Sequence, residues 1–257
     1  MKQIDVEQAK GHLLLAKMGK KVLRPGGKEL TQKLIQDLKI YSEDDVVEFA
    51  PGLGYTASLI LAKNPKSYTG IDSDKAMIAQ LQKKISGSNQ KFILADASQT
   101  GLAAESTDKV IGEAMLSMQS PHQKTAIIKE AHRILNKGGF YGIHELSLDN
   151  ELNDTLKAKI QKYFTVKMKV NARPLTQQEW KNLLENEGFA IREIKTTPMH
   201  LLEPKRMIAD EGLFGALQIG INILTHPETK KRILEMRKTF KKYQKHISAI
   251  SIVAQKV

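Results

Sequence analysis

The stretch Val46–Thr56 reads VVEFAPGLGYT, a short apolar strand that ends in an acid and runs into a glycine loop. Gly52 and Gly54 have no Cβ atom, so the loop can turn tightly and let a ligand lie against bare main chain. A helix is expected to begin near Tyr55, directly after the loop. The pattern predicts a nucleotide-like ligand at the end of the strand but does not name it.

Three further strand ends carry acids in the same order along the chain. The predicted strand 66–71 leads to Asp72, the strand 92–95 leads to Asp96 and the strand from Val110 ends in Glu113. A predicted helix 122–135 then stops at Gly138 and Gly139, directly before a strand 140–146. Alternating strands and helices of this kind predict an α/β fold with a mostly parallel sheet.

Two families compete for the loop. Read from Gly52 to Ala57, it is the G-x-G-x-x-A form of a dinucleotide fingerprint, with Asp72 placed to hold a ribose hydroxyl. Read from Glu48 as E-x-A-x-G-x-G, it resembles motif I of the class I S-adenosylmethionine (SAM) methyltransferases, with Ala50 in place of the first glycine. An αβ loop without a ligand is a third reading, since a lone glycine motif is weak evidence.

Glu48 and a later turn favour the methyltransferases. A carboxylate at the strand end would repel a pyrophosphate, whereas it attracts the sulfonium and ammonium groups of SAM. The string HRILNKGGF, which ends at Phe140, resembles the R-x-L-k-P-G-G turn of the family, with Lys137 where proline is usual. The resemblance covers residues 44–146 and is nearest to the group that includes the ubiquinone and menaquinone C-methyltransferases.

The resemblance implies SAM as the cofactor and gives each matched residue a role. Asp72 would accept from both ribose hydroxyls, and Asp96 would accept from the adenine amino group. The residues expected to bind the cofactor are Glu48, Ala50, Gly52, Gly54, Asp72, Ser73, Asp96, Ala97, Glu113 and Arg24.

The same resemblance implies a Rossmann-like, seven-stranded sheet whose last strand is antiparallel, with helices on both faces. We expect one methyltransferase domain over residues 1–257, with an N-terminal helical lid, 1–42, built from helices 4–18 and 28–38. The SAM-binding core would span 44–146 and the rest of the sheet 147–203. A helical cap insertion, 204–246, and a last strand, 247–257, would follow.

Composition limits the chemistry. The 257 residues are 41% hydrophobic, enough for a sizeable core, and include no cysteine. Disulfides, cysteine zinc sites, iron–sulfur clusters and cysteine nucleophiles are therefore excluded, and polar methyl displacement is the reaction expected. Neither a signal peptide nor an apolar run long enough to span a bilayer is recognised, which predicts a cytoplasmic protein.

A net charge of +12 raises the question of an anionic partner. Residues 229–246 predict a helix with Ile233, Met236, Phe240 and Tyr243 on one stripe and basic residues over the rest. A solvated outer face is the main interpretation, with RNA or an anionic membrane as alternatives. No aromatic residues alternate with these bases as stacking on nucleic acid would require.

The segments outside the core predict a substrate enclosure. The turn Arg24–Gly27 would bring Arg24 to the SAM carboxylate, or serve only as a linker. The apolar string GLFGALQIGINIL, residues 212–224, predicts core packing or the lining of an apolar substrate pocket. The acceptor would be a small, partly apolar molecule methylated at O, N, S or carbon. An RNA methyltransferase and a non-enzymatic SAM- or NAD-binding module are the alternatives.

Candidate bases should lie at the carboxyl ends of the fourth and fifth strands. Glu113 is the preferred base or substrate anchor, and His144 is the second candidate, although strand histidines are often hydrogen-bonded core residues. His122 is expected to lie at a helix start. Glu113 with Asp149–Asn150 only loosely matches metal-dependent relatives, so no metal is expected.

Overall fold

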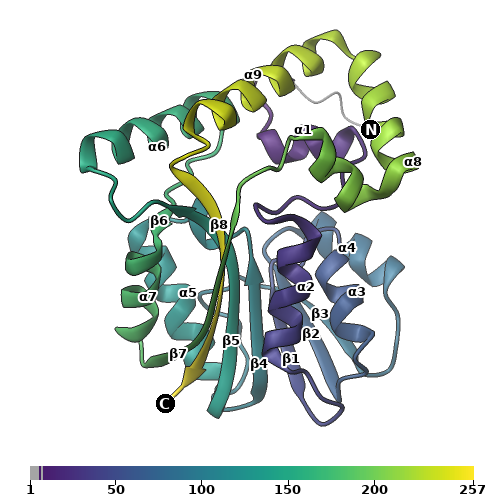
Figure 1. The fold of residues 1–257 in the computed structure, drawn as a ribbon. Helices are drawn as coiled ribbons and strands as arrows, with labels where there is room; N and C mark the ends of the chain where they lie inside the picture. The colour runs from purple at the N-terminus through teal and green to yellow at the C-terminus, as the bar shows by residue number, and fades with distance from the viewer. Residues whose placement is uncertain (1–5, 7) are drawn as a thin grey trace.

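The structure, a computed structural model, describes residue 6 and residues 8–257. Within these residues one sheet has the strand order β3-β2-β1-β4-β5-β8-β7, and the short β6 pairs with β5 outside this path (Figure 1). The pairs from β3 to β5 are parallel, and β8 runs antiparallel to both β5 and β7. The strands are β1 (Asp45–Phe49), β2 (Ser67–Asp72), β3 (Gln90–Leu94), β4 (Thr107–Glu113), β5 (Leu135–Leu148), β6 (Leu175–Thr176), β7 (Phe189–Pro198) and β8 (Ile247–Lys256).

This architecture confirms the predicted Rossmann-like fold with its antiparallel C-terminal strand. The helices are α1 (Gly11–Lys17), α2 (Gly27–Leu38), α3 (Tyr55–Leu61), α4 (Lys75–Lys84), α5 (Pro121–Ile134), α6 (Asp154–Met168), α7 (Gln177–Glu185), α8 (Pro204–Leu224) and α9 (Pro227–Tyr243). The start of the predicted helix 4–18 lies outside the described residues. The capping box expected at α7 is present, with Thr176 and Glu179 bonding each other's backbone N–H groups.

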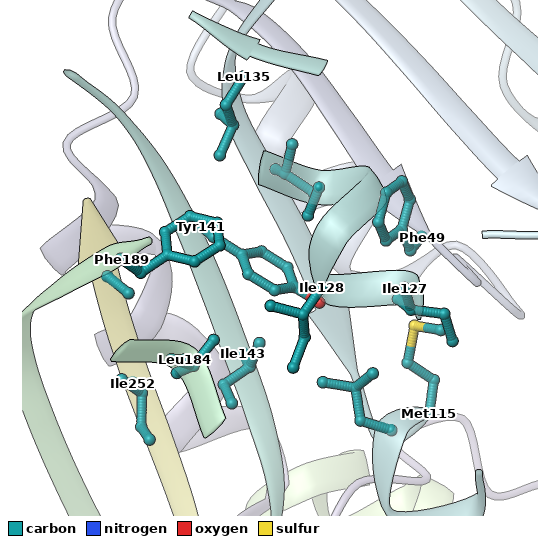
Figure 2. Packing of buried hydrophobic residues seen from close by; sticks show 14 of the residues in the cluster. Phe49, Met115, Ile127, Ile128, Leu135, Tyr141, Ile143, Leu184, Phe189 and Ile252 are labelled. Atoms are coloured by element: carbon teal, nitrogen blue, oxygen red, sulfur yellow. The ribbon is translucent and has the colours of Figure 1, made fainter. Parts of the chain in front are cut away.

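Each face of the sheet has its own apolar core. On one face, α5 and α7 pack against the strands around Tyr141, Ile143 and Phe189 (Figure 2). On the other face, α2 and α3 pack on Val46 and Ile111. Successive residues of a strand therefore point to opposite cores. The two-residue period of a strand requires this when both faces of its sheet are covered.

A third apolar cluster holds a helical cap together at one end of the sheet. It joins α1, α6, α8 and α9 through buried residues such as Leu15, Phe164, Ile233 and Met236. Figure 1 shows these four helices above the end of the sheet where β5 leads into α6. The cap therefore covers the carboxyl ends of the parallel strands, where ligands bind in this class of fold.

The two N-terminal helices have different places. α1 lies in the cap beside α9 and α6, whereas α2 packs on β5 and β8. Side chains of Leu34 and Leu38 lie so close to Gly142 that a Cβ atom there would come within 3.0 Å of both. The predicted lid 1–42 thus divides into a cap helix and a sheet-covering helix, joined by the turn at Arg24–Gly27.

The cap insertion differs from its prediction in one helix. The basic helix α9 buries Ile233, Met236, Phe240 and Tyr243 as expected. In α8, by contrast, Ile219 is the buried residue of the apolar string 212–224, and its large neighbours face solvent. Core packing was therefore wrong for most of that string: Ile219 joins the cap cluster with the half-buried Ile223, and Ile219 and Asn222 lie against Met18 and Gly19.

Candidate functional site

The loop after β1 adopts a strained backbone suited to close contact with a ligand. Ala50, Gly52 and Gly54 have φ values of 52°, 54° and 78°, in the left-handed region. Glycine occupies this region freely, whereas Ala50 is there at a cost of about 1–2 kcal/mol. Ala114, at the end of the neighbouring strand β4, has φ 53°. Strained residues at adjacent strand ends are typical of a functional site.

Arg24 projects into this region from the turn between α1 and α2. Its Nε lies 3.4 Å from Glu113 Oε2, and its guanidinium carbon lies 5.2 Å from the centre of the Tyr55 ring. Its Nε and Nη1 atoms are buried without a hydrogen-bond acceptor. Because buried guanidinium groups normally have acceptors, Arg24 has capacity for an anionic group here.

Glu113 is the centre of a buried network. Its Oε1 accepts from Thr31 Oγ1 at 2.6 Å and from His144 Nδ1 at 2.8 Å. Its Oε2 accepts from Thr56 Oγ1 and faces Arg24. Burial alone would raise the pKa of Glu113, but the charge of Arg24 and the bonds from His144 and Thr31 outweigh it and lower the pKa to about 2.

The hydrogen bonds around His144 also determine which of its ring nitrogens carries the proton. The backbone N–H of Gly26 donates to His144 Nε2 at 2.9 Å, so Nε2 is the acceptor and Nδ1 carries the proton that Glu113 accepts. A Cβ atom on Gly26 would lie 2.9 Å from that nitrogen, so only glycine fits this approach. Both ring nitrogens of His144 are thus engaged, and Glu113 is saturated with donors.

Glu48 is buried beside these groups. Its Oε2 accepts from the Tyr68 hydroxyl at 2.6 Å. Burial raises the pKa of Glu48 to about 8, with a further rise from the charge of Glu113, while the Tyr68 bond and Arg24 oppose the rise. A cationic ligand next to Glu48 would stabilise its carboxylate form.

The other predicted cofactor residues lie along the neighbouring strand ends. Asp72 ends β2 half-buried, and burial raises its pKa while backbone N–H groups of Asp74 and Gly52 oppose this rise. Ser73 is exposed beside it. Asp96 follows β3, is exposed and accepts from the Ser98 hydroxyl and the Gln123 amide. Ala97 follows Asp96, half-buried.

An apolar cavity lies next to this polar site. It lies between the cap and the carboxyl ends of β4 and β5 and has a volume of about 70 Å³. Most of its lining is aliphatic, aromatic or methionine, from α1, α6, α9 and the segments between elements. Its lining includes His12, Leu15, Pro25, Ala114, Glu145, Phe164, Met168, Ala172, Met199 and Phe240. α8 supplies none of the described lining residues, so the predicted pocket-lining role of residues 212–224 is wrong.

Two polar groups of this cavity, Glu145 beside the candidate base His144 and His12 of α1, were not among the predicted site residues. Glu145 is buried, and its carboxylate accepts from the backbone N–H groups of Met115, Leu116 and Ser117 at 2.7–3.0 Å. His12 faces the cavity from α1, and burial together with the charge of Lys10 lowers its pKa. An acid inside the apolar strand GIHELSL and a histidine beside the run LLLA were the available signals.

Metal ligation has no support in the described part of the chain, where no three His, Asp or Glu side chains are grouped closely enough to hold an ion. Asn150 accepts from the backbone N–H of Gln178, the second residue of α7. His122 is exposed in the first turn of α5.

Comparison with known proteins identifies the domain that holds this site. The family described as "methyltransferase domain" matches residues 46–139, which hold the loop, Asp72, Asp96 and Glu113. A protein of Haemophilus influenzae (strain ATCC 51907 / DSM 11121 / KW20 / Rd), named only as uncharacterized, is 33% identical over 250 residues, 96% of this chain and 98% of its own. Residues 46–139 therefore form a methyltransferase domain of the class I, SAM-dependent type.

Two further likenesses bear on this methyltransferase. Ribosomal RNA small subunit methyltransferase A of Sulfurihydrogenibium sp. (strain YO3AOP1) is 36% identical over 70 residues, 27% of each chain. Phosphoethanolamine N-methyltransferase 2 of Haemonchus contortus, solved in complex with SAM, has a TM-score of 0.73 at 14% identity. That likeness covers 96% of this chain and 56% of the other, and it shows the shared fold.

The residues of the site fit the cofactor of the family, SAM. Arg24 offers buried donors without acceptors, which suits the SAM carboxylate. Glu48 suits the cationic end, and the half-buried Asp72 suits the ribose hydroxyls. The positive-φ loop leaves main chain open beside them. These individual assignments remain predictions.

Proposed function

We propose that this methyltransferase transfers the SAM methyl group to a small, largely apolar acceptor held in the cavity under the cap. The observation that supports this most is the position of the cavity. Pro25 and Ala114 line it, and they directly follow Arg24 and Glu113, which face the proposed cofactor site. An acceptor in the cavity would therefore lie beside the cofactor. Bound SAM supplies an activated methyl group, so the protein mainly aligns the reactants and excludes water.

His12 is the proposed base for an acceptor that must lose a proton. It faces the cavity, and its lowered pKa keeps the imidazole neutral at pH 7, ready to accept a proton. His12 would take up the proton that the acceptor loses as it gains the methyl group. Glu145 is held by three backbone donors and would fix the shape of the cavity floor.

Glu113 and His144 are proposed as positioning residues rather than as the base. Glu113 already accepts from Thr31, Thr56 and His144 and pairs with Arg24, and its pKa of about 2 makes it a weak proton acceptor. Both residues tie the N-terminal turn to the sheet. In this way they would hold Arg24 against the cofactor.

The test is a methyl-transfer assay with labelled SAM and a panel of small apolar phenols, thiols and amines. Wild type should methylate at least one of them. His12→Gln should lower kcat about a hundredfold at neutral pH with little change in KM for SAM. The matched control is His122→Gln, an exposed histidine, which should keep full activity.

A second variant tests the cavity itself. Ala172 is a buried lining residue, and Ala172→Trp would fill the space. Transfer should be lost while SAM affinity, measured by calorimetry, is retained. Unchanged transfer in a folded Ala172→Trp protein would place the acceptor elsewhere.

RNA is the second candidate acceptor. The chain is basic, and the relative from Sulfurihydrogenibium that matches 70 residues is an RNA methyltransferase by name. Gel-shift binding to RNA with a steep salt dependence, followed by methylation of that RNA, would favour it over the small acceptor. The apolar lining of the cavity argues against a polar nucleobase.

A further inference from the structure

Large exposed apolar side chains are concentrated on α8. Phe214 has 87% of its surface exposed, and Leu217 has 56%. On a helix with 3.6 residues per turn, these residues lie on one stripe about 100° wide. The stripe consists of Leu213, Phe214, Leu217, Ile221 and Leu224, all more than half exposed. A contiguous apolar face of this kind on a soluble fold marks an interaction surface.

The part of α8 before Gly212 is fixed to the protein by charged pairs. Lys20 Nζ lies 3.2 Å from Asp210 and 3.6 Å from Glu211, and all three side chains are buried. Glu211 also accepts from the backbone N–H groups of Lys21 and Val22. After Gly212, Ile219 is buried and Asn222 Nδ2 donates to the Met18 carbonyl at 3.0 Å, so the apolar stripe faces outward.

The length of the apolar part determines how it can meet a bilayer. By length and composition alone, the helix Pro204–Leu224 could cross a membrane, and little of it is buried. Gly212, however, has non-helical backbone angles and divides it. The uncharged part, 213–224, is 12 residues or about 18 Å long, well short of the roughly 30 Å hydrocarbon core. This geometry suits a helix lying in the membrane surface.

The charge around the stripe indicates which kind of partner binds it. Residues 204–246 contain ten Lys and Arg against four Asp and Glu, and two of these acids are the buried Asp210 and Glu211. Exposed Lys205 precedes the stripe, and exposed Lys230 and Lys231 follow it at the start of α9. A second copy of the chain would bring the same positive charge, whereas anionic headgroups would complement it.

We infer that α8 docks this methyltransferase on an anionic membrane surface, with the stripe inserted among the lipid headgroups and the flanking lysines paired with lipid phosphates. This arrangement requires no change in the cofactor site, because α8 lines neither that site nor the cavity.

The test is flotation of the full chain with vesicles of phosphatidylcholine alone and with 30% phosphatidylglycerol. Wild type should float with the anionic vesicles and much less with the neutral ones. The variant Leu217→Glu should lower partitioning about tenfold or more. Tyr41→Glu is the matched control, since Tyr41 is 57% exposed and lies between α2 and β1, away from the cap. It should bind like wild type.

The flanking lysines provide an independent test. Replacement of Lys230 and Lys231 by glutamine should weaken binding roughly fivefold per lysine at low salt, and less at 0.5 M salt. Melting temperatures of all variants should match wild type, since these side chains are exposed.

Three results would overturn the inference. The first is wild type that does not float with anionic vesicles, and the second is an equal loss in Leu217→Glu and Tyr41→Glu. The third is a concentration-dependent dimer that dissociates in Leu217→Glu. That result would show that the stripe binds a second copy of the chain.

Discussion

The two sides of the candidate site are held together by different forces. On the sheet side, Glu48, Glu113 and Glu145 are buried carboxylates that accept directed hydrogen bonds. On the cap side, α1, α6 and α9 are joined by apolar contacts around a cavity. Directed bonds fix atoms in place, whereas apolar packing tolerates changes of shape. The comparison indicates that cofactor geometry is set by the sheet and acceptor choice by the cap.

The largest expected effect comes from breaking the network on the sheet side. Glu113→Gln leaves the Arg24 guanidinium buried without its main counter-charge. The free energy of unfolding should fall by about 3 kcal/mol, as measured by urea denaturation. The control Glu105→Gln removes an exposed partner of Lys256 and should cost less than about 1 kcal/mol. Slower turnover with unchanged stability would instead make Glu113 the base.

A smaller effect is expected from Asp72→Ala. Loss of two hydrogen bonds between a carboxylate and the ribose hydroxyls should weaken SAM binding about a hundredfold in calorimetry. Asp74 is the matched control, because it caps α4 through the N–H groups of Ala76 and Met77. Asp74→Asn keeps that cap and should bind SAM normally. Equal losses in both variants would contradict the assignment of Asp72.

A pH effect is expected from Glu48, whose pKa of about 8 exceeds the ordinary 4.5. The folded protein retains the proton between these values while the unfolded chain has lost it, so stability should fall as pH rises from 5 to 8. SAM should favour the carboxylate, so its affinity should rise by up to about tenfold per pH unit below 8.

Several charged groups surround Glu48, so the pH effect needs a difference measurement. Tyr68, Glu113, Arg24 and Asp72 all influence its pKa. Glu48→Gln keeps a neutral partner for Tyr68 and should remove the extra pH dependence of both stability and SAM binding. If the variant and wild type have the same pH profiles, the buried acid does not face the cofactor's positive end.

The smallest expected effect concerns the strained loop. Ala50→Gly should raise stability by about 0.5–1 kcal/mol, roughly 2 °C in melting temperature, because glycine adopts φ 52° without strain. The control Ala97→Gly, at a residue with negative φ, should lower stability by a similar amount. If both substitutions lowered stability, the strain of the loop at Ala50 would be negligible.

The sheet side was more predictable from the sequence than the cap for the same physical reason. Glycines and strand-end acids are local signals, so the succession of strands along the chain and the place of Glu48, Asp72 and Glu113 could be read directly. The glycine stop predicted before a strand 140–146 was wrong, because β5 begins at Leu135 and includes Gly138. Thr31 reaches Glu113 from a helix 82 residues away in sequence. Only its position on the apolar stripe of α2 could have indicated a buried partner.

The cap was harder to predict because the sequence of an apolar segment does not indicate which part of the protein it packs against. The string 212–224 has the composition of a core helix, yet Ile219 is its fully buried residue and five large apolar side chains are exposed. His12 is similar, since its role follows from α1 lying in the cap beside the cavity. Tertiary placement, not local pattern, determines both.

The most direct test of the central account is a thermal-shift titration of the wild-type chain and Asp72→Ala with SAM, its demethylated product and NAD. SAM and the product should raise the melting temperature of wild type, and NAD should not. Asp72→Ala should need far more SAM for the same shift. Stabilisation by NAD alone, or an equal response of both proteins to SAM, would contradict the account.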